Sequence, residues 1–431
     1  MDNAIMKTRP YLIILAIILL GLSLRIHGIA SRSYWVDEEQ SIRNSVTGGL
    51  VRGLGHETHP PLYYVILNIW MRIFGQSELS TRALSALFGT ASILLIFKIG
   101  SALFGRWTGT ISAFLLAVSA THIMHSQEAR MYALMSMLAL MSMHFFIGMI
   151  RDGKTAAYII STALLLYTHI YGFFILLAQV IYVLSWERRR LKLLRPQLIV
   201  AAAFLPWVMV LCVQVLKIKT GQITNIDWIA PPTLESIYGS FRYYVYYNNF
   251  TLFLFSLLAV SQLFKGKNRG LLLLWLLLPV LVPFFISKLL FPIYMPKYTI
   301  ACSLAFYILS SAGICMLRNK PLRVIAVLAL GYLSLTGVES YYSSHDPEPW
   351  RDVAEFIDNA AGYADSVAVL PDYARESFVR YSHRTDLNVT AAGTDPHRGW
   401  VVIRHGTEGM RFGNITVLDY TGDQSHISKI Y

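Results

Sequence analysis

The chain has 431 residues, of which 55% are hydrophobic and only 14% are charged. A soluble protein carries about 25% charged residues, so this composition excludes a wholly soluble chain and places most of the protein in lipid. The formal net charge is +12, but the basic residues lie in short loops between apolar runs. That pattern indicates membrane orientation, and not the nucleic-acid binding that such a charge suggests in a soluble protein.

The first predicted element is an apolar run over residues 10–29, which follows Lys7 and Arg9. It is interpreted as an uncleaved signal anchor that forms the first membrane span. A spanning helix needs about 20 mainly apolar residues, and about 11 runs approach that pattern. The predicted spans cover 10–29, 80–104, 107–124, 131–150, 155–170, 172–186, 197–216, 250–264, 270–288, 298–316 and 321–338.

Lysine and arginine predict the orientation, because short cytoplasmic loops carry an excess of both. With the N-terminus inside, the inner connections hold Lys7 and Arg9; Lys98 and Arg106; Arg151 and Lys154; Arg188, Arg189, Arg190, Lys192 and Arg195; Lys265, Lys267 and Arg269; Arg318, Lys320 and Arg323. An odd number of spans then places the C-terminal tail outside. We expect a multi-pass protein of the inner (plasma) membrane, with a cytoplasmic N-terminus and an extracytoplasmic C-terminus.

Two domains are expected, a membrane domain over residues 1–340 and an extracytoplasmic domain over 341–431. The first outer loop, about 30–79, holds an amphipathic stretch from Val65 to Phe74, which is too short to span and suits the interface. In the tail, a helix is predicted at Trp350–Ala361 and strands at Ser366–Leu370, Trp400–His405 and Ile415–Tyr420. The fold class is therefore an all-α polytopic membrane protein with a small α/β C-terminal domain.

Three adjacent carboxylates, Asp37, Glu38 and Glu39, stand in the first outer loop. They repel one another, which is easiest to explain if one acts as a base and another binds a cation or a basic side chain. The alternative is a solvated loop in which Asp37 caps a helix, and composition alone slightly favours it. A divalent cation is left open as a cofactor, with Glu38, Glu39 and His56 as candidate ligands.

Other polar side chains are expected at the same outer depth. His59 stands directly before two prolines, which fix the backbone and hence the direction of its side chain. The remaining candidates lie at the predicted outer ends of helices, at Tyr63, Arg130, Tyr132, His169, Tyr171, Lys297 and Tyr298. Each alone reads as an interfacial anchor, which is the favoured interpretation for the aromatic residues. Together with Asp37 they suit an anionic lipid headgroup, whose phosphate Arg130 and Lys297 would hold.

Several short motifs now carry a family resemblance. They are Trp35-Val36-Asp37-Glu38, His59-Pro60-Pro61-Leu62-Tyr63-Tyr64, the stretch from Ser77 to Gly89, Gln127-Glu128-Ala129-Arg130-Met131-Tyr132-Ala133-Leu134, Tyr167-Thr168-His169-Ile170-Tyr171-Gly172 and Pro296-Lys297-Tyr298. In this order and spacing, over about residues 10–340, the chain resembles the prokaryotic branch of the protein O-mannosyltransferase family (glycosyltransferase family 39). That branch includes the aminoarabinose transferases of lipid A modification.

The resemblance implies a membrane glycosyltransferase of the GT-C fold that uses a sugar on a polyprenyl or dolichyl phosphate. Transfer is implied on the extracytoplasmic side, with inversion at the anomeric carbon. The resemblance makes Asp37 the catalytic base and places His59, Arg130 and Tyr298 near the lipid phosphate. Glu38 is then a supporting acid or an ion ligand. We assign Tyr63, Tyr132, His169 and Tyr171 to substrate binding, and Glu39 has no role in the motif.

The expected partners are a polyprenyl-phosphate-sugar donor, membrane lipids, and an acceptor hydroxyl on a lipid, glycan or protein. A transporter or flippase of lipid-linked sugars is the main alternative, since it also needs polar residues facing a cavity. Transporters usually place such residues near the midplane, within repeated or broken helices, whereas here they gather at one face and the sequence has no visible repeat. A third interpretation is a scaffold that binds through its outer tail.

Overall fold

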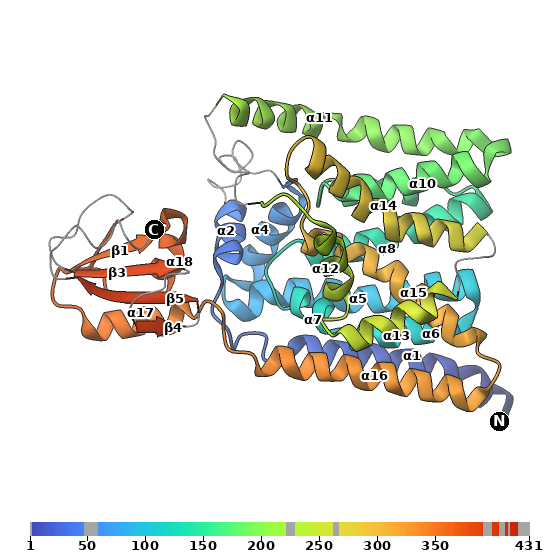
Figure 1. The fold of residues 1–431 in the computed structure, drawn as a ribbon, viewed down its shortest axis with the longest axis horizontal. Coiled ribbons are helices and arrows are strands. Elements are labelled where there is room, and N and C mark those ends of the chain that lie inside the picture. Colours follow the sequence, from blue (N-terminus) through green and yellow to red (C-terminus); the bar gives the residue numbers. More distant parts are fainter. Residues whose placement is uncertain are drawn as a thin grey trace.

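The computed structural model describes residues 2–46, 59–220, 229–261, 267–390, 399–404, 410–412 and 414–420. Figure 1 shows a bundle of long helices, with a small domain of helices and strands at one end and the N-terminus at the opposite end. The predicted fold class is therefore confirmed. The small domain and the start of the first helix thus lie at opposite ends of the bundle. The side of the membrane that each end faces stays a prediction.

The predicted spans all contain apolar helices. These are α1 (Asp2–Ile26), α5 (Glu78–Phe104), α6 (Arg106–Ala117) with α7 (Ala120–Ser126), α8 (Tyr132–Asp152), α9 (Ala156–Leu166), α10 (Gly172–Trp186), α11 (Leu194–Lys219), α13 (Asn249–Val260), α14 (Lys267–Leu289), α15 (Ile300–Met316) and α16 (Lys320–Ser343). Within the described residues, six helices are long and apolar enough to cross a membrane, or seven if α6 and α7 form one bent span. Shorter apolar helices, including α9, α10 and α13, account for the remainder. The helix count is thus compatible with the prediction of about 11 spans.

Helix α15 forms the centre of the bundle, because nearly all of its side chains are buried. Small residues let neighbouring helices approach closely, as is common between helices in membranes. A Cβ atom on Gly313 of α15 would lie 2.2 Å from the Leu258 carbonyl oxygen of α13. Likewise, a Cβ atom on Gly109 of α6 would lie 2.4 Å from the Phe97 carbonyl oxygen of α5. These glycines therefore set the helix spacing.

A buried arginine stabilises the break between α6 and α7, where the chain bends by 61°. Arg25 of α1 is fully buried and donates to the carbonyl oxygens of Leu116 (3.1 Å) and Ala117 (3.2 Å). It also donates to Ser126 of α7 (3.2 Å). Backbone groups at a helix break need such partners, since lipid supplies none. Arg25 therefore allows a bend just below the outer loops.

Three short helices lie in segments predicted to be outer loops, α2 (Val36–Ser45), α4 (Leu62–Phe74) and α12 (Leu234–Tyr244). Figure 1 places α2 and α4 at the end of the bundle nearest the small domain. The amphipathic stretch predicted from Val65 to Phe74 lies in α4, whereas α12 was not predicted. A short 3₁₀ helix, η2 (Pro296–Thr299), leads into α15.

The small domain is built on α17 (Trp350–Ala360), β1 (Ser366–Leu370), α18 (Arg375–Tyr381), β2 (Asn388–Thr390), β3 (Gly399–Arg404), β4 (Met410–Phe412) and β5 (Ile415–Tyr420). The strand order is β2-β1-β3-β5-β4, in which β1 is parallel to β2 and β3, and the remaining pairs are antiparallel. The predicted helix and three predicted strands are all present. Helix α16 continues to Ser343, slightly past the expected domain boundary at 340.

We predict that Arg25→Met lowers the stability of the folded protein in detergent by about 2 kcal/mol or more. The reason is that it leaves buried carbonyl oxygens at the α6–α7 break without a donor. Thermal unfolding of the purified protein measures the effect. Arg318→Met is the control, because Arg318 is exposed in the turn after α15, and equal losses from both variants would contradict the role of Arg25.

Candidate active site

The three carboxylates occupy the first turn of α2. The positive end of the helix dipole stabilises negative charges at this position. Successive residues of a helix point about 100° apart, so the acids face three different segments of the protein. Asp37 faces Arg130 and Lys297, Glu38 faces Arg82, and Glu39 faces Arg380. The repulsion expected from their crowding is thus relieved by separate basic partners.

Glu38 forms a buried, bidentate ion pair with Arg82 of α5. The Arg82 Nε atom lies 2.8 Å from Oε1 and Nη2 lies 2.7 Å from Oε2, and both side chains are at most 3% exposed. Arg82 also donates to the carbonyl oxygens of Ile29, Arg32 and Ser33. The Ala129 backbone N–H donates to Glu38 at 2.7 Å. This pair therefore joins α2, α5 and the segment that carries Arg130.

Asp37 is the carboxylate that stays accessible, with a side chain that is 34% exposed. Its Oδ2 atom lies 3.4 Å from the Lys297 ammonium and 3.6 Å from the Arg130 guanidinium. Burial alone would raise the pKa of Asp37, but the charges of Arg130 and Lys297 outweigh it and hold the pKa below its usual value. Arg130 is itself fixed, since it donates to the Asp37 carbonyl oxygen and to the Ser41 hydroxyl, both at 3.0 Å.

Histidines and tyrosines from four segments gather beside these charges. The rings of His59 and His169 lie 5.1 Å apart, and those of His169 and Tyr298 lie 5.0 Å apart. Tyr132 stacks on Tyr298 at 6.4 Å, and the Arg130 guanidinium lies 5.9 Å from the Tyr132 ring. The predicted phosphate-binding and substrate-binding residues at these positions are therefore brought together next to Asp37.

Burial disfavours the charged form of both histidines. Burial, and then the neighbouring charges of Arg130 and Lys297, lower the pKa of His169 to about 3. Burial also lowers the pKa of His59 well below its usual value. The His169 Nδ1 atom accepts the Tyr171 backbone N–H at 3.1 Å, so its Nε2 carries the proton. That buried Nε2–H has no hydrogen-bond partner among the described residues, which leaves it available to donate to an anion.

Tyr63 and Tyr171 are packing residues in this structure. Tyr63 is fully buried, and its hydroxyl contacts the Ser85 hydroxyl at 3.4 Å. The Tyr171 hydroxyl donates to the Ile293 carbonyl oxygen at 3.0 Å. That bond ties the turn that holds His169 to the chain just before Lys297, so Tyr171 supports the site indirectly. Their predicted roles in substrate binding remain untested.

Among the candidate metal ligands, the two that the structure describes, Glu38 and Glu39, face different partners. Glu38 and Glu39 each bind an arginine, and His56 lies outside the described residues. Within the part of the chain that the structure describes, no group of three or more His, Cys, Asp or Glu side chains is placed to hold a metal ion. Of the two kinds of partner expected from the sequence, a metal cation or a basic side chain, both glutamates have the basic side chain in this structure.

Sequence reasoning missed two features of the site. The Lys297 ammonium lies 5.3 Å from the centre of the Trp35 ring, whose buried Nε1–H has no hydrogen-bond partner among the described residues. His125 bridges the Glu128 carboxylate (2.9 Å) and the Tyr243 hydroxyl (2.6 Å). Trp35 stands two residues before Asp37, and Glu128 stands two residues before Arg130. Their positions within the recognised motifs could therefore have indicated that both lie near the site.

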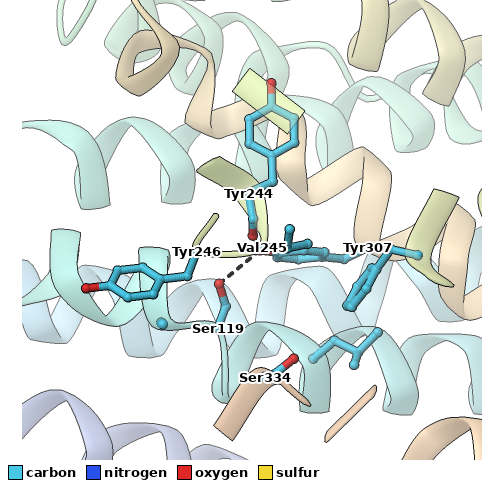
Figure 2. A pocket seen from close by; sticks show the side chains of 9 residues that line it. Ser119, Tyr244, Val245, Tyr246, Tyr307 and Ser334 are labelled. Carbon is cyan, nitrogen blue, oxygen red and sulfur yellow. Dashed lines mark hydrogen bonds between the residues drawn. The ribbon is translucent and has the colours of Figure 1, made fainter. Parts of the chain in front are cut away.

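A small pocket lies elsewhere, beside the break between α6 and α7. Figure 2 shows Ser119, Tyr244, Tyr246, Tyr307 and Ser334 around it. The Ser119 hydroxyl bonds to the Tyr307 hydroxyl at 2.9 Å. None of the predicted site residues lines this pocket, so it is distinct from the Asp37 site.

Comparisons with known proteins give the class to which this arrangement corresponds. A family profile described as dolichyl-phosphate-mannose-protein mannosyltransferase matches residues 58–213. A comparison with curated protein sequences finds no match. Among solved structures, ArnT from Cupriavidus metallidurans bound to undecaprenyl phosphate is similar with a TM-score of 0.63 at 11% identity, covering 94% of this chain and 97% of that one.

A second similar structure is the archaeal oligosaccharyltransferase AglB from Archaeoglobus fulgidus, in complex with an inhibitory peptide and a dolichol-phosphate. Its TM-score is 0.56 at 12% identity, covering 90% of this chain and 65% of that one. The chain therefore has the GT-C fold, and its resemblance to this group of glycosyltransferases is confirmed. The family match and the fold together support a multi-pass membrane glycosyltransferase.

We predict that Arg82→Met destabilises the protein by about 3–5 kcal/mol, because it leaves the Glu38 carboxylate buried without its partner. Arg351→Met is the matched control. Arg351 also pairs with a glutamate at 2.7 Å, Glu78, but its side chain is 43% exposed, and such pairs contribute about 0–1 kcal/mol. Chemical unfolding in detergent compares the two, and similar losses would show that burial of the Glu38–Arg82 pair is not what matters.

Proposed function

We propose that the chain transfers a sugar from a polyprenyl-phosphate-linked donor to an acceptor hydroxyl on the extracytoplasmic face, with inversion and with Asp37 as the general base. The observation that carries the proposal is the accessible Asp37 carboxylate beside Arg130 and Lys297. These three side chains bring together a proton acceptor and two positive charges.

The chemistry needs both parts. A hydroxyl becomes a strong nucleophile when a base removes its proton, and we assign this step to Asp37. The acceptor oxygen then bonds to the anomeric carbon while the bond from that carbon to the phosphate oxygen breaks. Attack on the face opposite the leaving group inverts the anomeric centre. The polyprenyl phosphate leaves with added negative charge, which Arg130 and Lys297 stabilise.

Neutral donors complete the phosphate site. The His169 Nε2–H and the Trp35 Nε1–H are both buried donors without a hydrogen-bond partner among the described residues. A buried donor without a hydrogen-bond partner costs free energy, which a phosphate oxygen would recover by accepting a hydrogen bond from each of these groups. His59 contacts the rings of both His169 and Tyr298. Because burial disfavours its charged form, His59 would line the phosphate site as a polar side chain without positive charge.

The shared cations couple donor binding to base strength. The charges of Arg130 and Lys297 lower the pKa of Asp37, which weakens its carboxylate as a base. A bound phosphate takes part of the charge of both cations, so the pKa of Asp37 rises toward its usual value. The base is therefore strengthened when the donor is in place, which limits unproductive proton transfer.

The comparisons support the lipid-linked donor. Both similar structures carry a polyprenyl-type phosphate, undecaprenyl phosphate in ArnT and dolichol-phosphate in AglB. The matching family profile is named for dolichyl-phosphate-mannose. A donor of this kind also accounts for a transferase in the membrane, since its long chain lies in lipid while its phosphate reaches the outer site.

We predict that Asp37→Asn lowers transfer by about 100-fold or more, because general acid–base catalysis contributes about 100- to 10,000-fold. The measurement uses purified protein in liposomes with a radiolabelled polyprenyl-phosphate sugar, and follows release of polyprenyl phosphate. Asp386→Asn in the C-terminal domain is the matched control, because Asp386 pairs with Arg384 within that domain. Transfer at the wild-type rate by well-folded Asp37→Asn protein would contradict the assignment.

The same liposomes separate the rival functions. A transporter or flippase moves the labelled lipid across the bilayer and never releases polyprenyl phosphate. A scaffold that binds through its tail loses function on deletion of residues 345–431, but not with Asp37→Asn.

A pH profile tests the cation pair. Lys297→Met removes a charge that lowers the pKa of Asp37, so the acid limb of kcat/KM should move to higher pH. Loss of that charge should also raise the KM for the lipid donor. Lys288→Met is the control, because Lys288 is exposed at the end of α14. An acid limb that is unchanged in Lys297→Met would exclude the proposed charge coupling.

A further inference from the structure

The C-terminal domain contacts the membrane domain directly at α2, the helix that carries Asp37. The side chain of Val36, which precedes Asp37, is buried in the core of the C-terminal domain with Trp350 of α17. Glu39, which had no role in the motif analysis, forms a bidentate ion pair with Arg380 of α18. Residues on both sides of Asp37 are therefore held by the C-terminal domain.

Glu348 is the centre of the first contact. It is 4% exposed, and its Oε2 atom accepts the Val36 backbone N–H at 3.2 Å and the Trp350 indole N–H at 3.2 Å. Its Oε1 atom accepts from Arg404 of β3 at 2.6 Å and 2.9 Å. A carboxylate held by four hydrogen bonds is rigid, so it fixes the start of α2.

A second set of contacts lies beside the Glu39–Arg380 pair. The Tyr381 hydroxyl accepts the Tyr34 backbone N–H at 2.8 Å and donates to Glu78 at 2.9 Å. Arg351 also pairs with Glu78, at 2.7 Å. These contacts tie α17 and α18 to the first outer loop and to the N-terminus of α5. The C-terminal domain thus contacts several segments of the membrane domain close to Asp37.

We propose that the C-terminal domain positions the catalytic base, through Glu348 on the Val36 amide and Arg380 on Glu39. The Glu38–Arg82 pair holds α2 from the membrane side, and these two contacts hold it from the outer side. Asp37 stays directed at Arg130 and Lys297 only while both sides are fixed. This inference rests on the proposed role of Asp37 as the base.

Two variants test the contacts separately, Glu348→Gln and Arg380→Gln. Each should lower kcat by about 10- to 100-fold, which is the scale of a misplacement of about 1 Å. The KM for the lipid donor should change by less than about twofold, because Arg130 and Lys297 are untouched. Arg380→Lys, which keeps the charge, should recover part of the loss. Asp386→Asn, in the same domain and away from α2, should leave kcat at the wild-type value.

A pH profile adds a readout that a general loss of stability does not move. The charged and titratable groups that face Asp37 are Arg130, Lys297, Tyr132, Tyr298 and, from the C-terminal domain, Arg404. Arg130 and Lys297 lie 3.6 Å and 3.4 Å from the Asp37 carboxylate and lower its pKa. If Glu348→Gln and Arg380→Gln displace Asp37 from both cations, the acid limb of kcat/KM should shift to higher pH in these variants. An unstable but correctly arranged site would lose amplitude without this shift.

The outcomes distinguish the two proposals. If Asp37→Asn is inactive while Glu348→Gln and Arg380→Gln keep the wild-type kcat, or lose kcat with the acid limb unmoved, the positioning role is wrong and the proposed function stands. If Asp37→Asn is fully active, the proposed function fails and the positioning role with it. If Glu348→Gln does not fold, the variants of the more exposed Arg380 decide the result. The positioning role then requires that Arg380→Gln lowers kcat and that Arg380→Lys restores part of it.

Discussion

The buried pair of Glu38 and Arg82 is the interaction on which the outer half of the protein depends. It joins α2 to α5, and through the Ala129 amide it also fixes the segment that ends in Arg130. Breaking such a pair leaves an uncompensated charge in a dry environment, so the two elements cannot separate at low cost. The site for Asp37 is therefore defined by a neighbouring acid that does not itself face the solvent.

A single helical turn gives three adjacent acids three different environments. Glu38 faces the interior of the membrane domain, Glu39 faces the C-terminal domain, and Asp37 faces the open site with its two cations. Glu38 and Glu39 fix the helix on either side, which leaves Asp37 as the carboxylate accessible for proton transfer. In the proposed mechanism, Glu38 and Glu39 position the helix and Asp37 carries out the proton transfer.

Local patterns predicted the fold well. Apolar runs located the helices, and alternation located β1 and β5 at their observed ends. Strands β2 and β4 have three residues each and are too short for a visible period. The partners of the acids lie far away in sequence, since Glu38 is 44 residues from Arg82 and Glu39 is 341 residues from Arg380. Such pairings depend on how α5 and α18 pack against α2, and a sequence pattern cannot show that.

An experimental structure with a non-hydrolysable polyprenyl-phosphate sugar bound tests the central claim most directly. The account predicts that the phosphate oxygens lie within hydrogen-bond distance of Arg130 and Lys297. The sugar should then lie between that phosphate and the Asp37 carboxylate, with Asp37 on the face of the anomeric carbon opposite the phosphate. A phosphate bound away from both cations, or an Asp37 carboxylate on the same face as the phosphate, would contradict it.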